Sequence, residues 1–187
     1  MNEAARMNRL STLDQINYPK FRGRIIELYL HAFTSGEYAQ YIDPRTAGST
    51  LDTLVRNGWG NMLFVGDRLA GVSMAMTLLH DVDFPADALP AIPPERTLYI
   101  SEVMVHADFR GRGIARQMVT ALLEGAGDRF SDAVIRVWER NEPALLLYNK
   151  LGFKPVATIR QTKLEAPGRP FEMTKIYLHR RICSSDV

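Results

Sequence analysis

The feature that most constrains the fold is a strand that runs through a glycine-rich turn into a helix. Residues 96–106, RTLYISEVMVH, are rich in β-branched and aromatic side chains, which predicts a long strand. Residues 110–113 then read RGRG. The segment that follows, IARQMVTALLEGAG over 114–127, has apolar residues at helical spacing and ends in glycine. A strand, a turn and a helix in this order are typical of an α/β domain.

The turn at 110–113 has the chemistry of an anion site. The first N–H groups of a helix have no partner within it and lie at the positive end of its dipole, so they bind phosphate oxygens. Gly111 and Gly113 allow close backbone approach, and Arg110 and Arg112 add positive charge. We therefore expect a phosphate or pyrophosphate ligand here, the alternative being an ordinary turn with solvated arginines. The spacing matches neither GxGxxG nor the P-loop, so the motifs for dinucleotide and ATP binding are missing.

The rest of the chain continues the mixture of helices and strands. Before the long strand, the pattern predicts helices over 21–33 and ending near Asn57, and a β-hairpin turning at Gly66-Asp67. Residues 81–95 contain four prolines and are predicted to form a loop. After residue 131 the sequence predicts a helix over 141–153 and strands over 132–140, 154–161 and 171–178.

Composition excludes several classes of protein. With 187 residues, of which 46% are hydrophobic and 24% charged, the chain fits one globular domain, and its formal net charge of +2 is too small to favour a nucleic-acid partner. Cys183 is the single cysteine, which excludes a disulfide framework and favours a reducing compartment. The first 15 residues are polar, and no stretch approaches the roughly 18 apolar residues of a membrane span. We expect a cytoplasmic protein without a membrane or nucleic-acid partner.

Two motifs resemble the GNAT superfamily of N-acyltransferases, which use acetyl coenzyme A or a related acyl thioester. The segment 110–115, RGRGIA, is similar to the family's Arg/Gln-x-x-Gly-x-Gly/Ala pyrophosphate loop and follows a strand that ends Val103-Met104-Val105. Residues 141–153 are similar to a later family motif of Asn, an alanine and then Leu-Tyr-x-x-Leu-Gly-Phe. One helix and one strand separate the two motifs, as in the family's core.

The resemblance implies a fold and a binding site. The fold is a single α/β domain over 1–187, with a mixed, partly splayed central sheet of about six or seven strands and helices on both faces. Residues 61–180 would form the acyl-CoA-binding core, and residues 1–60 a helical region on the acceptor side. Acetyl coenzyme A would be held without a metal by Met104, Val105, Arg110, Gly111, Arg112, Gly113, Ile114, Ala115 and Asn141. Homodimers are common in the family, so a homodimer is one option that the resemblance leaves open.

The second motif also carries a candidate acid. Asn141 and Tyr148 are seven residues apart, so on one helix they share a face and lie about 10 Å apart along the axis. Asn141 has the position of an N-cap, and a contact with the coenzyme is what the resemblance adds. A tyrosine on a helix face is more often a core residue with a satisfied hydroxyl. The resemblance implies instead that Tyr148 is the general acid that protonates the departing thiolate.

Glu102 is the candidate base. On a regular strand it alternates with Leu98, Ile100, Met104 and His106, and a lone carboxylate on such a mostly apolar face is either a buried base or a salt-bridge partner. Both alternatives stay open, and a β-bulge would change the face to which Glu102 points. Backbone N–H groups near Met104 or Val105 would stabilise the oxyanion. His106 and His80 are alternative groups for proton transfer.

The acceptor is predicted to be an amine of a small molecule or peptide. Asp81, Asp83 and Asp87 make the proline-rich loop acidic, which would suit a cationic amine if the loop overhangs the site, the alternative being a solvated loop. The sequence therefore predicts an acetyl-CoA-dependent N-acetyltransferase. One competing hypothesis is a coenzyme-A-binding regulatory module without catalysis. Another is RNA binding through the RGRG turn, which lacks surrounding basic residues and interleaved aromatics.

Overall fold

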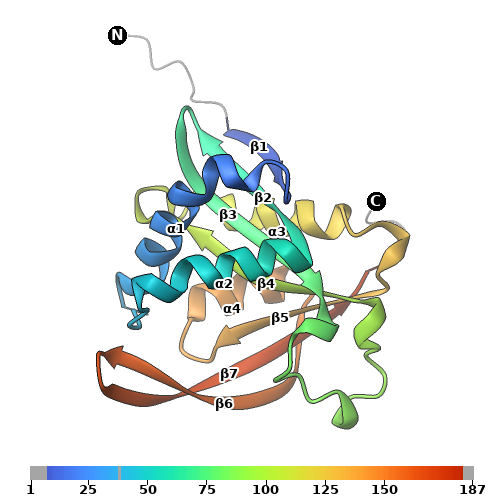
Figure 1. The fold of residues 1–187 in the computed structure, drawn as a ribbon. Coiled ribbons are helices and arrows are strands. Elements are labelled where there is room, and N and C mark those ends of the chain that lie inside the picture. The colour runs from blue at the N-terminus through green and yellow to red at the C-terminus, as the bar shows by residue number, and fades with distance from the viewer. Residues whose placement is uncertain (1–7, 38, 183–187) are drawn as a thin grey trace.

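Seven strands form one sheet in the order β1-β2-β3-β4-β5-β7-β6, and four α-helices pack on it (Figure 1). The computed structural model describes residues 8–37 and 39–182, so Cys183 lies outside the described residues. The strands are β1 Asn8–Leu13, β2 Gly58–Val65, β3 Arg68–Thr77, β4 Thr97–Val105, β5 Asp132–Trp138, β6 Lys154–Ala166 and β7 Arg169–Arg181. The helices are α1 Tyr18–Thr34, α2 Pro44–Asn57, α3 Ile114–Glu124 and α4 Glu142–Lys150.

The two pairs of helices cover opposite faces of the sheet (Figure 1). Apolar residues of α1 and α2, among them Ile25 and Leu51, pack with β2 and β3 and with Met104 of β4. On the other face, α3 and α4 pack against Leu98, Ile100 and the inward residues of β5. A sheet that is buried on both faces explains why the central strands read as almost continuous apolar runs.

The middle of the sheet splits. β4 and β5 are parallel and pair only over Thr97–Ile100 with Asp132–Ile135, although both strands continue beyond these residues. Directly after the last pair, β4 carries a bulge: Ala75 of β3 pairs with Ile100 and Met74 with Glu102, which leaves Ser101 without a partner in the ladder. A bulge bends its strand and increases its twist. The gap between the carboxyl ends of β4 and β5 follows from this bend.

Most of the predicted elements are confirmed, including the second helix, which ends at Asn57, and the turn between β2 and β3. The mixed, splayed sheet is also confirmed. Two features differ from the prediction. The region 1–60, expected to be helical, also contributes the edge strand β1, whose polar sequence NRLSTL carries little strand signal. The last two strands are 13 residues each, longer than predicted.

The extended β6–β7 hairpin reaches past the sheet and bends toward the loop between α1 and α2 (Figure 1). There the N–H of Tyr41 donates to the carbonyl of Leu164 at 2.6 Å, which forms an isolated bridge. The hairpin therefore forms a wall on the same side of the sheet as α1 and α2.

The proline-rich segment after β3 is a loop with three short 3₁₀ turns, Leu78–His80, Ala86–Ala88 and Pro94–Arg96. It is anchored by Phe84 and Ile92, whose side chains are buried in a cluster with Tyr99 and Tyr177. Among residues 8–37 and 39–182, no helix has both the length and the apolar character needed to cross a membrane.

Candidate active site

A cavity of about 840 Å³ lies at the gap between β4 and β5. Its wall is built by the ends of these two strands, the turn before α3, α4 as far as Tyr148, the β6–β7 hairpin, and residues of α1 and α2 such as Phe33 and Leu54. A ligand in this cavity therefore contacts residues from both faces of the sheet.

The glycine-rich turn forms one end of the cavity. Gly111 and Gly113 have φ angles of +74° and +75°, the left-handed region that favours glycine, and Gly113 is the N-cap of α3. A Cβ atom added at either glycine would meet no atom within 4 Å, so the backbone is open to a ligand. The wall here consists of Arg110, Gly111, Gly113, Ile114, Ala115 and Arg116. The sequence predicts an anion site at this turn, and Arg116 lines the same wall although it is not among the predicted residues.

The two arginines of the turn have different surroundings. Arg110 donates from Nε to the carbonyl of Val105 at 3.3 Å, which holds its side chain beside the end of β4. Arg112 instead lies over the ring of Phe109, 5.4 Å from its centroid, and is not part of the cavity wall. Of the two, only Arg110 is placed to contact a ligand in the cavity.

The edge of β4 offers backbone groups to the gap. The N–H of His106 donates to Ala70 of β3 at 2.9 Å. Since hydrogen-bonding direction alternates along an antiparallel strand, the N–H groups of Val103 and Val105 point away from β3. Both residues line the cavity. Met104, predicted as a coenzyme contact, has its side chain buried under α1 and α2 and off the cavity wall.

Glu102 stands on the cavity wall, and the bulge decides its orientation. The regular alternation that would group Glu102 with Leu98 and Ile100 is wrong, because the extra residue Ser101 reverses the phase of the strand. Leu98 and Ile100 pack toward α3 and α4, whereas Glu102 faces the other side together with Met104. Within the described residues it forms no ion pair or hydrogen bond, which removes the salt-bridge alternative there.

Burial raises the pKa of Glu102 from its usual value to about 7, and the positive charges of Lys175, Arg136 and Lys163 oppose this rise. A carboxyl group with a pKa near neutrality exchanges protons at physiological pH, which is the property of a general base. Glu102 therefore lines the cavity with a pKa near neutrality, and its role as the base stays a prediction.

Helix α4 places the other two predicted residues. The side chain of Asn141 accepts from the N–H of Ala144 at 3.3 Å, so it caps the helix, and it also lines the cavity. Tyr148 lies two helical turns further along α4. It is 6% exposed and packs edge-on against Phe153, with 6.2 Å between the ring centroids. Burial, reinforced by the charge of Glu102, raises the pKa of Tyr148. Its hydroxyl stays protonated at neutral pH and is available as a proton donor.

The alternative proton-transfer groups, His106 and His80, differ in their surroundings. His106 stacks on His31, with ring centroids 4.2 Å apart, and faces a separate pocket of about 410 Å³. Its Nδ1 accepts from the N–H of Asp108 at 3.3 Å. His80 lies on the wall of the main cavity but is exposed, and Asp87 is exposed and off this wall.

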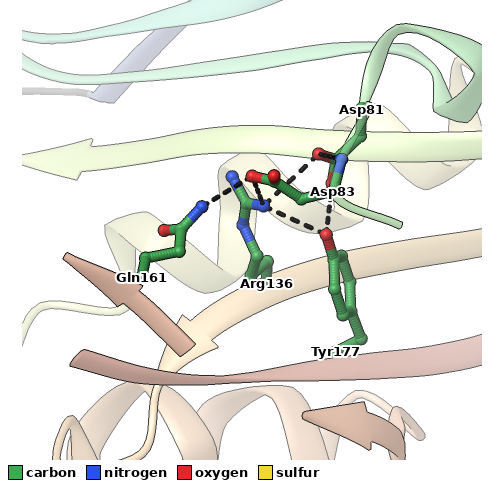
Figure 2. A network of polar contacts seen from close by, with 5 residues as sticks. All are labelled: Asp81, Asp83, Arg136, Gln161 and Tyr177. Carbon is green, nitrogen blue, oxygen red and sulfur yellow. Dashed lines mark hydrogen bonds and ion pairs between the residues drawn. The ribbon is translucent and has the colours of Figure 1, made fainter. Parts of the chain in front are cut away.

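The other two acidic residues of the proline-rich loop are bound within the protein (Figure 2). Asp81 accepts from the Tyr177 hydroxyl at 2.8 Å and from Arg136 at 3.3 Å. Asp83 accepts from Arg136 at 3.0 Å and from the Gln161 amide at 2.6 Å. Both carboxylates already have partners within the protein. They are therefore neither a free acidic surface for a cationic amine nor part of a merely solvated loop, the two alternatives considered from the sequence.

The cavity also holds three cations that sequence reasoning missed. Arg136 of β5, Lys163 of β6 and Lys175 of β7 all line it. Lys163 and Lys175 lie in strands whose sequences mix polar and apolar residues, where a charged side chain is normally solvated, so the sequence contains no signal for them. Arg136 is different, because it is the one charge within the otherwise apolar stretch 133–138 of β5. Burial, followed by repulsion from Lys163 and Arg136, lowers the pKa of Lys175 to about 8.

With this geometry in place, comparison with known proteins identifies the family. The profile described as the acetyltransferase (GNAT) family matches residues 22–153. The chain belongs to the GNAT acetyltransferase family. No curated protein sequence matches the chain.

Solved structures of GNAT proteins share the fold of this family member at low sequence identity. The ribosomal-protein-S18-alanine N-acetyltransferase from Escherichia coli superimposes with a TM-score of 0.64 at 16% identity, covering 94% of both chains. An N-acetyltransferase from Staphylococcus aureus gives a TM-score of 0.70 at 16% identity, covering 95% of this chain and 99% of that one. The Salmonella typhimurium protein yncA, solved with its cofactor acetyl-CoA, gives 0.67 at 16% identity over 95% of both chains.

The pKa of Glu102 predicts a pH-dependent difference in stability. Because the folded-state pKa lies above the unfolded value near 4.5, this carboxyl group favours folding most at low pH, and the benefit is lost as pH rises to about 7. Relative to the parent, Glu102→Gln should therefore gain melting temperature between about pH 5 and pH 8. Thermal melts across this range measure the gain. Glu124→Gln, at an exposed position of α3, is the matched control and should show none; equal curves for both variants would contradict the burial of Glu102.

Proposed function

We propose that the protein is an N-acetyltransferase that transfers the acetyl group of acetyl coenzyme A to an amine of a small molecule or peptide. The observation that carries the proposal is that one cavity is lined by the anion-binding turn, Glu102 and Tyr148 together. The turn recognises the pyrophosphate, and the two side chains supply a proton acceptor and a proton donor. Acyl transfer from a thioester to an amine needs a deprotonated nucleophile, a stabilised oxyanion and a proton for the leaving sulfur, and the two side chains serve the first and the third of these needs.

The residues at the turn suit coenzyme A. The two left-handed glycines, the open space beside them and the first N–H groups of α3 form a cradle for phosphate oxygens. Arg110 and Arg116 add charge, and Asn141 lines the wall across the gap. The exposed N–H groups of Val103 and Val105 resemble an unpaired strand edge, which suits the amide groups of an extended pantetheine arm. Acetyl-CoA in the yncA structure supports the choice of donor.

The proposed chemistry assigns one proton to each side chain. The thioester substrate supplies an electrophilic carbonyl carbon. The Glu102 carboxylate accepts a proton from the ammonium group of the acceptor, directly or through water, and so leaves an amine lone pair free to attack. The Tyr148 hydroxyl donates its proton to the departing sulfur. The nitrogen loses its second proton as the amide forms, and this proton returns to the Tyr148 oxygen, directly or through water. The N–H groups of Val103 or Val105 face the gap where the oxyanion would form.

A coenzyme-A-binding module without catalysis is the second candidate. Such a module needs the turn but has no use for a buried, unpaired carboxylate or for a buried tyrosine hydroxyl without a partner among the described residues. Burying both groups destabilises the fold, and groups kept at such a cost are typical of catalytic sites. The RNA hypothesis loses support, because Arg110 and Arg112 are directed at Val105 and Phe109 instead of forming a basic patch.

Coenzyme binding can be tested at two glycines of equal geometry. Gly113 and Gly168 both have positive φ, +75° and +72°, and open space for a methyl group. Alanine at either position should cost about 1–2 kcal/mol of stability from left-handed strain. Only Gly113→Ala should weaken acetyl-CoA, by about tenfold or more in Kd, because its methyl group enters the phosphate cradle. Titration of the acetyl-CoA-induced rise in melting temperature measures this. Equal shifts in both variants would remove the turn from the site.

The base can be tested by the pH dependence of turnover. A general base must be deprotonated, so kcat/KM of the parent should rise with pH through the pKa of Glu102 near 7. Glu102→Gln should lower kcat/KM at pH 7 by about 10² to 10⁴ and recover part of it at high pH, where free amine is abundant. Glu124→Gln should keep the parental profile. A variant at position 102 with parental rate and profile would assign the base to another group.

The acid is best tested by a pair of Tyr→Phe variants. Tyr148→Phe should lower kcat by about 10² to 10⁴ with little change in melting temperature, because no described residue bonds the hydroxyl. Tyr18→Phe is the inverse control: its hydroxyl donates to Asp52 at 2.8 Å, remote from the cavity. That variant should lose about 1 kcal/mol of stability and keep its kcat. Parental kcat in Tyr148→Phe would exclude this residue as the acid.

A further inference from the structure

The β6–β7 hairpin presents a row of polar side chains to one end of the cavity. In the register of the two strands, Lys163 pairs with Phe171 and Gln161 with Met173, and alternation puts Lys175 on the same side as Tyr177. Since Tyr177 packs with Tyr99 and the proline-rich loop, this side is the face opposite α3 and α4. Lys163 and Lys175 therefore line the cavity from the face toward which Glu102 points.

The two lysines lack partners, whereas the neighbouring arginine has several. Arg136 binds Asp81, Asp83 and the hydroxyl of Tyr177 (Figure 2). Neither Lys163 nor Lys175, both half-buried, forms a hydrogen bond or ion pair with residues 8–37 or 39–182. Burial lowers the pKa of each, and the positive charge of Arg136 lowers both further. Glu102 and the aspartates of the proline-rich loop act on the two lysines electrostatically without forming an ion pair with them. Two partly buried cations that lack a direct partner form a site for an anion.

The charges around the cavity select the kind of anion. Apart from Arg110 and Arg116 of the turn, the cavity wall holds three cations, Arg136 and the two lysines, and two carboxylates, Asp81 and Glu102. A third carboxylate, Asp83, is off the wall and pairs with Arg136. The aspartates are bound to Arg136, and Glu102 is the acceptor for an ammonium proton, so the lysines are the groups left for a negative charge. A ligand with one ammonium and one carboxylate group matches this arrangement without leaving a charge unpaired.

We propose that the acceptor is a zwitterionic amine, an amino acid or a short peptide with a free carboxylate, which Lys163 and Lys175 bind while Glu102 faces its ammonium group. The inference rests on the proposed function and names its substrate class. The carboxylate fixes the distance of the amine from the hairpin and so orients it toward the gap between β4 and β5. A polyamine would bring a second positive charge against the lysines, and a phosphate monoester would bring a second negative charge against three carboxylates.

The test is a panel of acceptors that differ in charge. It contains amino acids and short peptides with free carboxylates, their carboxamides, spermidine and phosphoethanolamine, with rates expressed per concentration of free amine. The parent should prefer each carboxylate over its carboxamide by about tenfold to hundredfold in kcat/KM, the range of a charge-assisted hydrogen bond. A preference for carboxamides, spermidine or phosphoethanolamine would overturn the zwitterion proposal and leave amine acetylation standing.

Variants assign the preference to the lysines. Lys163→Met and Lys175→Met should each bring the ratio of kcat/KM for a carboxylate to kcat/KM for its carboxamide close to one, with KM for acetyl-CoA close to the parent. The ratio is the readout because both lysines lower the pKa of Glu102, so either variant changes the absolute rates. Arg160→Met is the matched control, because Arg160 is an exposed cation on the opposite side of β6. Loss of acetyl-CoA affinity in the lysine variants would assign these cations to coenzyme phosphates instead and overturn the proposal.

A binding measurement separates this inference from the proposed function. In the presence of coenzyme A, N-acetylated amino acids should raise the melting temperature of the parent and of Arg160→Met above its value with coenzyme A alone. They should give no such additional rise in the two lysine variants. If they do so while no amine is acetylated, the carboxylate site stands and the transferase proposal fails. If they do not stabilise the parent, the carboxylate site is overturned whatever the panel shows.

Discussion

The separation of β4 from β5 is the constraint on which the rest of the structure depends. After four paired residues on each strand, the bulge at Ser101 turns β4 aside, and the hydroxyl of Ser101 donates to the carbonyl of Met74 at 3.2 Å within it. Three consequences follow at once. Strand-edge N–H groups become free, a cavity opens through the sheet, and Glu102 changes face. A regular strand here would pair further with β5 and close the cavity.

The ionisable groups around this opening differ in how their charges are compensated by neighbouring residues. Glu102 is held without a partner and titrates near neutrality, while Arg136 is surrounded by two carboxylates and a phenol. The same low-dielectric surroundings therefore produce a reactive group in one position and an inert one in another. The difference lies in local hydrogen bonding, since Nη1 of Arg136 donates to acceptors of the proline-rich loop and β7, whereas no described residue donates to the Glu102 carboxylate.

The sequence predicts the donor side of the site far better than the acceptor side. The turn at Gly111 and Gly113 and the helix that begins after Asn141 are contiguous motifs whose geometry follows from local rules for glycine, caps and helix ends. Lys163 and Lys175 reach the cavity only because a long hairpin bends over it, which depends on register and on the contact between Tyr41 and Leu164. The face of β4 to which Glu102 points could not be predicted for a similar reason, because a single inserted residue leaves no trace in composition or periodicity.

That contact between the hairpin tip and the α1–α2 loop has a consequence for how such a protein can change over evolution. The donor residues lie in the middle of the chain, whereas the opposing wall is a terminal hairpin at the edge of the sheet, attached at its tip through backbone atoms. A backbone contact places little demand on side chains, so the inward residues of β6 and β7 can be exchanged without disturbing the turn before α3. The architecture thus separates the turn and helix motifs in the middle of the chain from a wall whose inward residues can vary independently of them.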